Sequence, residues 1–548
     1  MIFEYKYRGF SQVASTPRST EMSFVPDANR DPLWFQGQLN EKLPFREAIS
    51  ALHQVVTSDL RLQIKDRSEY KLWAQQQEEV WLAEYMEGSI ANKARLEEVR
   101  QEYEALREQK HQAMKPFYDA RQKYFDHIYR FDRLLWIVLD PIISVHPDEI
   151  FFECFSQDES SYGRLSCSHE VFNTMGDFRC GTTNIDYSRA LYDEFSRIRN
   201  YKTTELKIDP EGFEVATGED YSLREEKIDV PDSWARGFLQ VSSAMTLEGT
   251  HLTLDPMDFH AICFHLKRRK EKKGPRSLRF KLVPGQPPVI TVDPWGIDIV
   301  CRRSQHEATE ATEIRIWGRR RLLILERMIP VAQKIRVKLL GYGLPSFWQV
   351  EMGLMKFTLG LSGWTANDWS KAGQFDLLAP RAKVSAETVQ RVLGQLNQDW
   401  SASSQSLANQ LGLENKDVLA ALVTGTQAGI VVRDLNDDLW RSRALSKEPL
   451  PLSKLRFANE RESLAQELIA AGAVSTQVET RLHGRRITGT VKDRDKTYDV
   501  DLEIDGDERL VKAKCTCNFF SQNKLRQGPC EHILAARLAQ TPPLLPSR

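Results

Sequence analysis

The sequence predicts a multidomain α+β protein: a helical, coiled-coil-like region near the N-terminus, a mixed α/β central region, a winged-helix-like domain and a small ββα-type C-terminal domain. Three observations lead to this prediction. Apolar residues recur at three- and four-residue steps between 67 and 140, strand-like and helix-like segments alternate from 141 to 380, and cysteines cluster with a histidine in the last forty residues. A chain of 548 residues is long enough for several such domains.

The first two parts of the chain differ in their pattern. Residues 1–66 are expected to be an N-terminal segment with one helix at 45–56. Residues 67–140 are expected to form a long helical arm, because Leu96, Val99, Tyr103 and Leu106 make a coiled-coil-like seam. Pro116 should interrupt the arm and give a helical hairpin or two helices in series. Such an arm either packs on itself or docks a partner protein, and the sequence leaves both open.

The centre is expected to hold an α+β domain at 141–235 and an α/β domain at 236–380. Strands are predicted at 150–155, 278–282, 289–292 and 314–317, and helices at 257–269 and 320–331. The first of these domains contains a second group of metal-ligand residue types, which are Cys154, Cys167, His169 and Cys180. Only Cys167 and His169 are closely spaced, so the group is either a second metal site or a set of buried thiols with a surface histidine.

A basic run stands out in the α/β domain. Its members are Lys267, Arg268, Arg269, Lys270, Lys272, Lys273 and Arg276. A basic run at the end of a helix is typical of a solvated loop that also suits the helix dipole. The alternative is a contact with phosphates or with an acidic partner. No aromatic residues interleave with the run, which argues against base stacking.

Residues 381–445 have the outline of a winged helix. Helices are predicted at 385–397, 403–411 and 415–428, and wing strands at 430–432 and 439–442. Residues 384–444 contain seven acidic and five basic residues, so the segment is net negative. Because phosphate contacts dominate DNA affinity, this charge favours a protein-interaction or spacer domain over a DNA reader.

The last domain, 446–548, carries the most specific motif. One residue separates Cys515 from Cys517 and Cys530 from His532, and twelve residues lie between the two pairs. Three thiolates and an imidazole form a tetrahedral Zn²⁺ site, and four protein ligands leave no open position for a catalytic water. Strand alternation from 511 should place Val511 and both sulfurs of the first pair on one face. Cys530 should begin a helix, where the dipole favours the thiolate.

The ligand pattern of Cys515, Cys517, Cys530 and His532, after a β-meander and before a short helix, resembles the SWIM zinc finger. With the segments 316–321, 341–348 and 357–369, it makes the chain similar to bacterial SWIM-containing proteins. That resemblance implies two protein partners, a MoxR-type AAA ATPase and a von Willebrand A-domain protein. It also implies a role in stress response or phage defence.

Other features exclude several function classes. The net charge of −1 gives no support for a dedicated nucleic-acid binder. Neither a P-loop nor a His-Glu-x-x-His motif is present, so we expect no catalytic residues and no enzyme activity. The N-terminus lacks the pattern of a signal peptide, and no apolar run is long enough to span a bilayer. A thiolate zinc site suits a reducing compartment, so we expect a cytoplasmic protein without membrane contact.

The sequence therefore predicts a non-catalytic adaptor or recognition subunit that binds one structural Zn²⁺ and works with protein partners. The alternative is a nucleic-acid-binding effector that uses the finger and the basic segment 267–281.

Overall fold

The computed structural model describes the chain in segments: residues 12–15, 18–24, 26, 31–58, 141–184, 195, 198–208, 232–269, 276–341, 344–363, 369, 375, 384–435, 439–445, 460–481, 484–505, 510–526 and 528–540. The chain divides into two compact units, residues 1–59 with 139–548 and residues 60–138. The helical arm predicted at 67–140 lies outside the described residues. Everything below concerns the first unit.

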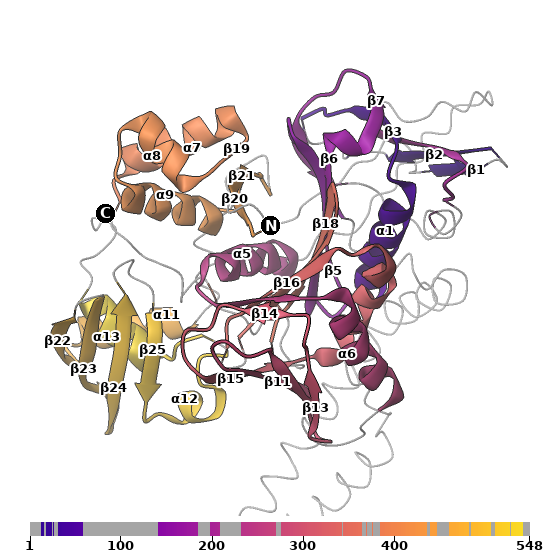
Figure 1. Cartoon of the computed structure of the whole chain (residues 1–548). Coiled ribbons are helices and arrows are strands. Elements are labelled where there is room, and N and C mark those ends of the chain that lie inside the picture. Colours follow the sequence, from indigo (N-terminus) through magenta and orange to yellow (C-terminus); the bar gives the residue numbers. More distant parts are fainter. Residues whose placement is uncertain are drawn as a thin grey trace, which may run out of the picture. The chain divides into compact units, whose positions relative to one another are not determined.

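An antiparallel sheet of nine strands forms the centre of this unit (Figure 1). Its order is β14 (Gln305–His306), β10 (Thr250–Leu254), β16 (Lys334–Leu339), β17 (Ser346–Met352), β18 (Met355–Leu361), β6 (Ser161–Ser168), β5 (Glu149–Phe155), β4 (Ile142–Val145) and β8 (Gly181–Asn184). In this sheet, β6, which precedes residue 235, pairs with β18, which follows it. Residues 141–235 and 236–380 therefore share one sheet instead of forming the two separate domains expected, because side-chain alternation does not show which strands pair.

Two helices cover the faces of this sheet. Helix α1 (Lys42–Thr57) packs on β5 and β6, and the thiol of Cys154 on β5 donates to the Leu52 carbonyl of α1. Helix α5 (Asp232–Thr246) lies on the opposite face, where Phe238 makes an edge contact with Phe155 at 4.7 Å between ring centroids. Burial on both faces explains why every residue of β5 is buried.

Two smaller sheets accompany the central one. The first has the order β1 (Gln12–Ser15), β2 (Ser19–Phe24), β9 (Thr203–Ile208), β3 (Phe35–Leu39) and β7 (Phe172–Met175). The second has the order β13 (Ile297–Val300), β12 (Val289–Val292), β11 (Ser277–Leu282) and β15 (Thr312–Trp317). Helix α6 (Pro256–Arg268) begins at Asp255, whose carboxylate accepts from the Met257 amide.

One predicted α-helix has a different geometry. The segment expected to be helical at 320–331 is the 3₁₀-helix η2 (Arg319–Val331), and the amides of Arg321 and Ala332 each donate to the carbonyl three residues earlier. Pro330 removes a backbone donor that an α-helix would use in its last turn.

Residues 384–445 form a module of three helices and a three-stranded sheet, which we call the helical module. Its elements are α7 (Ala386–Asp399), β19 (Ser401–Ala402), α8 (Ser404–Leu411), α9 (Asn415–Gln427), β20 (Val431–Asp434) and β21 (Leu439–Ser442). Two serines begin helices as side-chain caps: Ser385 accepts from the Thr388 amide and Ser403 from the Ser406 amide. Gly412 ends α8 in the left-handed region that favours glycine.

The C-terminal domain is an antiparallel sheet with helices on one face. The strands are β22 (Val474–Arg481), β23 (Gly484–Asp493), β24 (Lys496–Asp505) and β25 (Leu510–Cys515), in that order. Helix α13 (Glu531–Ala539) packs on all four strands and α11 (Glu460–Ala470) packs on α13 (Figure 1). Ile487, Leu502, Ile533 and Leu534 are buried between them. In the part of the chain described, no helix is long and apolar enough to cross a membrane.

Candidate metal centre

Four ligand-type side chains converge where the C-terminal sheet ends. Cys515 is the last residue of β25, Cys517 is the N-cap of α12 (Asn518–Asn523), Cys530 is the N-cap of α13, and His532 lies in the first turn of α13. One ligand atom from each lies within 4.8 Å of the others, and all four residues are buried. The predicted ligand set is therefore brought together as a group that could hold one metal ion.

The two sulfurs of the first pair meet for a different reason from the one expected. The strand stops at Cys515, and Cys517 begins a helix in which its sulfur accepts from the Phe520 amide at 3.3 Å. A turn from strand to helix, and not strand alternation, therefore brings both sulfurs to the site.

Val511 also departs from the predicted alternation. Its side chain is 50% exposed, while Leu510 is buried in its place. The register between β24 and β25 shifts at Glu503 and Ile504, so β25 carries one extra residue there. This β-bulge turns Val511 outward, away from the face that Cys515 occupies.

The surroundings of His532 fit a metal ligand. The residue is 1% exposed, and neither ring nitrogen has a hydrogen-bond partner among the described residues. The ring of Tyr498 covers it, with 4.2 Å between centroids. A buried imidazole without a partner is costly, and coordination of a cation by one nitrogen removes that cost. Three thiols beside it complete a Cys₃His set, which is a zinc donor set.

The four residues shift one another's pKa values, so that two of them favour the deprotonated form and two favour the protonated form. A hydrogen bond from Cys530 lowers the pKa of Cys515 to about 6 and that of Cys517 to about 5. Donation to both sulfurs raises the pKa of Cys530 well above its usual value. Burial lowers the pKa of His532, but the neighbouring sulfurs of Cys515 and Cys517 outweigh this and raise it to about 9. Two sulfurs thus favour the thiolate, the form that binds zinc.

Two carboxylates flank the histidine. Asp493 Oδ2 lies 3.6 Å from Nε2 and Glu531 Oε1 lies 3.7 Å from Nδ1. Asp493, Glu531 and His532 also form a group that could hold a metal, but this group shares the histidine with the Cys₃His set. Carboxylates beside a ligating imidazole orient the ring and increase its basicity, so the pair supports the main site.

The second cysteine group does not form a site. Among the described residues, no metal-binding group includes Cys154, Cys167, His169 or Cys180. Cys154 and Cys167 are fully buried in β5 and β6, and burial raises the pKa of both thiols. The ring of His169 packs edge-on against Phe178. The sequence left open a second metal site or buried thiols, and the structure shows buried thiols for Cys154 and Cys167.

The described part of the basic run makes contacts within its own chain. Lys267 forms an ion pair with Glu326 at 2.7 Å, and the guanidinium of Arg268 lies over the ring of Phe264. Arg269 is the C-cap of α6, and Arg276 precedes β11. The remaining members, Lys270, Lys272 and Lys273, lie outside the described residues.

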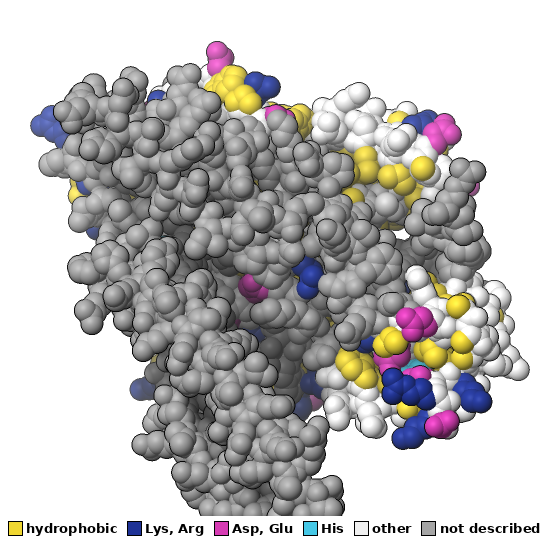
Figure 2. All heavy atoms as spheres, turned by 180° about the vertical axis from the view of Figure 1, so that it is seen from behind, with side chains coloured by type: hydrophobic (Ala, Val, Ile, Leu, Met, Phe, Trp, Pro, Cys, Tyr) yellow, Lys and Arg dark blue, Asp and Glu magenta, His cyan; other side chains and the backbone are white. Residues whose placement is uncertain are grey.

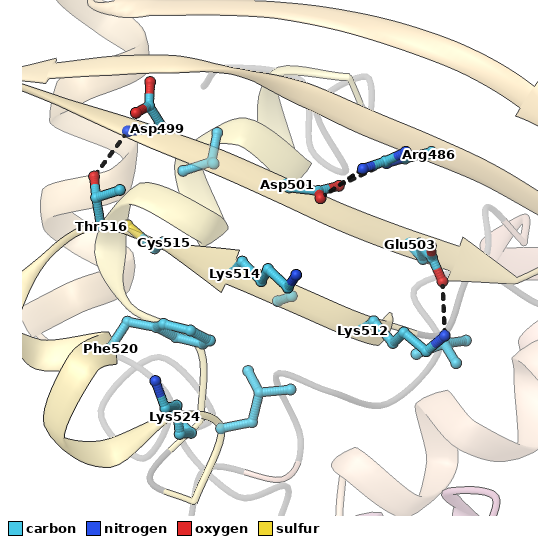
Figure 3. Close-up of a pocket in the computed structure, with 14 residues that line it drawn as sticks. Arg486, Asp499, Asp501, Glu503, Lys512, Lys514, Cys515, Thr516, Phe520 and Lys524 are labelled. Atoms are coloured by element: carbon cyan, nitrogen blue, oxygen red, sulfur yellow. Dashed lines mark hydrogen bonds and ion pairs between the residues drawn. The ribbon is translucent and has the colours of Figure 1, made fainter.

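A groove that the sequence did not predict lies beside the metal centre. It has a volume of about 890 Å³ and runs along β25, with Asp501 and Glu503 of β24 on one side (Figure 3). Phe520 of α12 and Lys524, the residue that ends this helix, lie on the other side. Lys512 and Lys514 of β25 lie between them. No pattern in the sequence predicted α12 or the groove that it lines. We call this feature the α12 groove.

The family comparison agrees with the ligand geometry. Residues 498–539 match the family model described as SWIM zinc finger. This segment is a SWIM zinc finger. The match covers β24, β25, α12 and α13, and therefore all four ligands.

Comparisons of the whole chain add no function. No curated protein matches it. Among solved structures, it is similar to the Proliferating Cellular Nuclear Antigen from Entamoeba histolytica, with 11% identity over 42% of this chain and 91% of that chain. The TM-score of 0.29 is too low to support an argument on fold or function.

Proposed function

We propose that the protein is a non-catalytic recognition subunit in which one Zn²⁺ folds the SWIM finger and the finger binds a protein partner. The observation that carries this proposal is the closed Cys₃His cluster, whose four residues are all buried. Four protein ligands in a buried tetrahedral set leave no place for a reactive water, which is typical of a structural site.

The helical module supports a protein-interaction or spacer role. We propose that it is a winged-helix-like domain, in which α9 takes the place of the recognition helix. A helix that reads DNA needs an exposed face with basic or amide side chains. Most of α9 is buried, and its exposed cation, Lys416, is paired with Glu414 at 2.6 Å. The helix therefore has little surface with which to enter a DNA groove.

Ion pairs also attach the helical module to the central sheet. Arg441 of β21 contacts Asp434 of β20 at 3.0 Å and Glu149 of β5 at 3.1 Å. Arg164 of β6 contacts the same two carboxylates. The wing strands are thus engaged within the chain, which favours a fixed structural role for this module.

The partners we propose are a MoxR-type AAA ATPase and a von Willebrand A-domain protein, in a bacterial stress or defence system, with the complex in the cytoplasm. This part rests on the family resemblance of the finger and of the segments 316–321, 341–348 and 357–369. Co-expression with an ATPase and an A-domain protein encoded beside the gene, followed by size-exclusion chromatography, tests it. We expect co-elution that Cys517→Ser abolishes. Separate elution of the wild-type proteins, with and without ATP, would refute these partners.

The second candidate is a nucleic-acid-binding effector, and the lysines of the α12 groove are the observation in its favour. However, among the described residues visible in Figure 2, Lys and Arg are interspersed with Asp and Glu. Titration of duplex and single-stranded DNA and RNA at several salt concentrations distinguishes the candidates. Tight binding with a steep inverse salt dependence would make the effector the better description.

A further inference from the structure

We propose that the α12 groove binds an extended protein segment that carries acidic and apolar side chains on one face, and that this segment adds a strand to the edge of β25. The inference rests on the proposed role of the finger in protein recognition and names the surface and the chemistry of the partner.

The backbone of β25 is available for pairing. This strand is at the end of the sheet and pairs with β24 alone among the described strands. The Thr516 amide donates to the Asp499 carbonyl at 3.2 Å. This bond shows which residues of β25 have their backbone groups turned toward β24. Because hydrogen-bonded and non-bonded pairs alternate along antiparallel strands, the N–H and C=O of Ala513 point to the open edge. Exposed strand edges accept extended peptides in this way.

Two lysines in the groove form no ion pair with a carboxylate of the described residues. Lys514 has no ion pair with any described residue, and the Lys524 ammonium lies 5.3 Å from the centre of the Phe520 ring. The other cations are already paired: Arg486 makes two hydrogen bonds of 2.8 Å to Asp501, and Lys512 contacts Glu503. Figure 3 shows these pairs on the β24 side, away from Lys524. Lys514 lies opposite Asp501 and its charge helps to lower the pKa of that carboxyl, but acidic side chains of an added strand could pair with Lys514 and Lys524 without breaking an ion pair.

Apolar surface borders the same edge. Val511 is half exposed at the β-bulge, whereas Leu525, which also lines the groove, is buried. Side chains of an added strand point alternately to its two faces. The face of the added strand that is turned to the groove would place acidic side chains at Lys514 and Lys524 and an apolar side chain at Val511, so acidic and apolar residues two positions apart are expected.

The groove does not suit a nucleic acid. Its lining has four basic residues and three acidic ones, a net charge of +1 (4 − 3). Phosphate contacts need a larger excess of positive charge. The aromatic ring in the groove, that of Phe520, is only 5% exposed, so its face is not open to stack on a base.

The test uses the zinc-loaded full chain. Selection from a displayed library of random peptides about twelve residues long should enrich sequences that carry acidic and apolar residues two positions apart. A dye-labelled peptide of the enriched sequence should bind with a Kd that the double change Lys514→Glu and Lys524→Glu weakens by about tenfold or more. Ala513→Pro should also weaken binding, because proline closes the open edge without removing a bond to β24.

Lys492→Glu is the matched control. Lys492 is exposed on β23 of the same sheet but does not line the groove, so its reversal should leave peptide affinity unchanged. Zinc content near one per chain in each variant shows that the finger is folded. Enrichment of no peptide, or equal affinity of the wild type and the groove variants, would overturn the proposal.

Two further results would also overturn it. The first is binding of an oligothymidylate that the lysine reversals abolish, combined with no peptide binding. The second is co-elution with the proposed ATPase and A-domain partners that survives the lysine reversals and Ala513→Pro. In that second case the proposed function would stand and only the groove assignment would fail.

Discussion

Replacing Arg441 by methionine tests whether buried charges hold the helical module on the central sheet. Arg441 and Asp434 are each 2% exposed in their side chains, and the guanidinium also contacts Asp148 at 2.9 Å and Glu149 at 3.1 Å. Methionine fills much of the same volume without charge. Arg164 would then face both Asp434 and Glu149, leaving one buried negative charge without a neutralising partner.

The cost of this substitution follows from burial. Removing one member of a buried ion pair destabilises a protein by about 3–5 kcal/mol, because the remaining charge is left without compensation. One factor of ten in an equilibrium corresponds to about 1.4 kcal/mol, so local opening of β20 and β21 should become roughly two to four orders of magnitude more frequent. The ion pair between Arg486 and Asp501 has similarly short distances but is partly exposed, so Arg486→Met should change little.

The loss of stability caused by Arg441→Met should depend on pH, and the pKa of Glu149 gives the direction of that dependence. Burial raises the pKa of Glu149, and Arg164 and Arg441 oppose that rise. Loss of Arg441 should therefore raise this pKa further. A carboxyl group with a raised pKa in the folded state binds protons preferentially there, so folding is favoured as the pH falls through that pKa. The deficit of Arg441→Met should thus shrink as the pH falls through the raised pKa of Glu149.

Hydrogen exchange measured by mass spectrometry is the assay, since it reports opening of individual segments in a protein of several domains. We expect faster exchange in β5, β20 and β21, and partial restoration by the second change Glu149→Gln, which removes the excess charge. Unchanged protection of these strands, or a deficit that grows on acidification, would refute the assignment of stability to this charge network.

Three further outcomes are expected. Cys517→Ser should lower bound zinc from one per chain to near zero by elemental analysis and expose the tail to protease, and retained zinc would contradict the ligand assignment. Zinc affinity, measured by competition with a chelator, should fall steeply below about pH 6, because protons then compete for Cys515 and Cys517, whose pKa values are about 6 and 5. Gly425→Ala should destabilise the helical module by about 1–3 kcal/mol, since the added methyl would lie 2.7 Å from Leu393. Gly394→Ala, where the methyl meets nothing within 4 Å, should stabilise it by up to about 1 kcal/mol, and equal thermal shifts for the two would contradict the packing argument.

Local signals in the sequence predicted local structure well. The spacing of Cys515, Cys517, Cys530 and His532 indicated the ligand set without knowledge of the fold, because two tight pairs satisfy a tetrahedral ion. Ser403 before an apolar run predicted the start of α8, since a serine side chain can satisfy a free amide there.

Features that depend on distant parts of the chain could not be predicted in this way. Pairing of β6 with β18 has no signature in either segment alone, so one sheet was expected to be two domains. No sequence pattern indicated that Arg164 and Arg441 are buried, because burial of an arginine depends on carboxylates that come from other elements. The outward turn of Val511 arises from a register shift against β24, which strand alternation alone does not show.

The position of Cys517 links metal loading to the shape of the surface beside it. This residue is a candidate zinc ligand and also the N-cap of α12, the helix that forms one wall of the groove. Loss of the ion would release Cys517 and so leave the N-terminus of α12 without its attachment to the metal site. Suppose that the groove binds a partner only when α12 is in place. Thermodynamic linkage then requires that the partner strengthen zinc binding by the same free energy with which zinc strengthens partner binding. Partner occupancy and resistance to chelators would then be two measurements of one coupling.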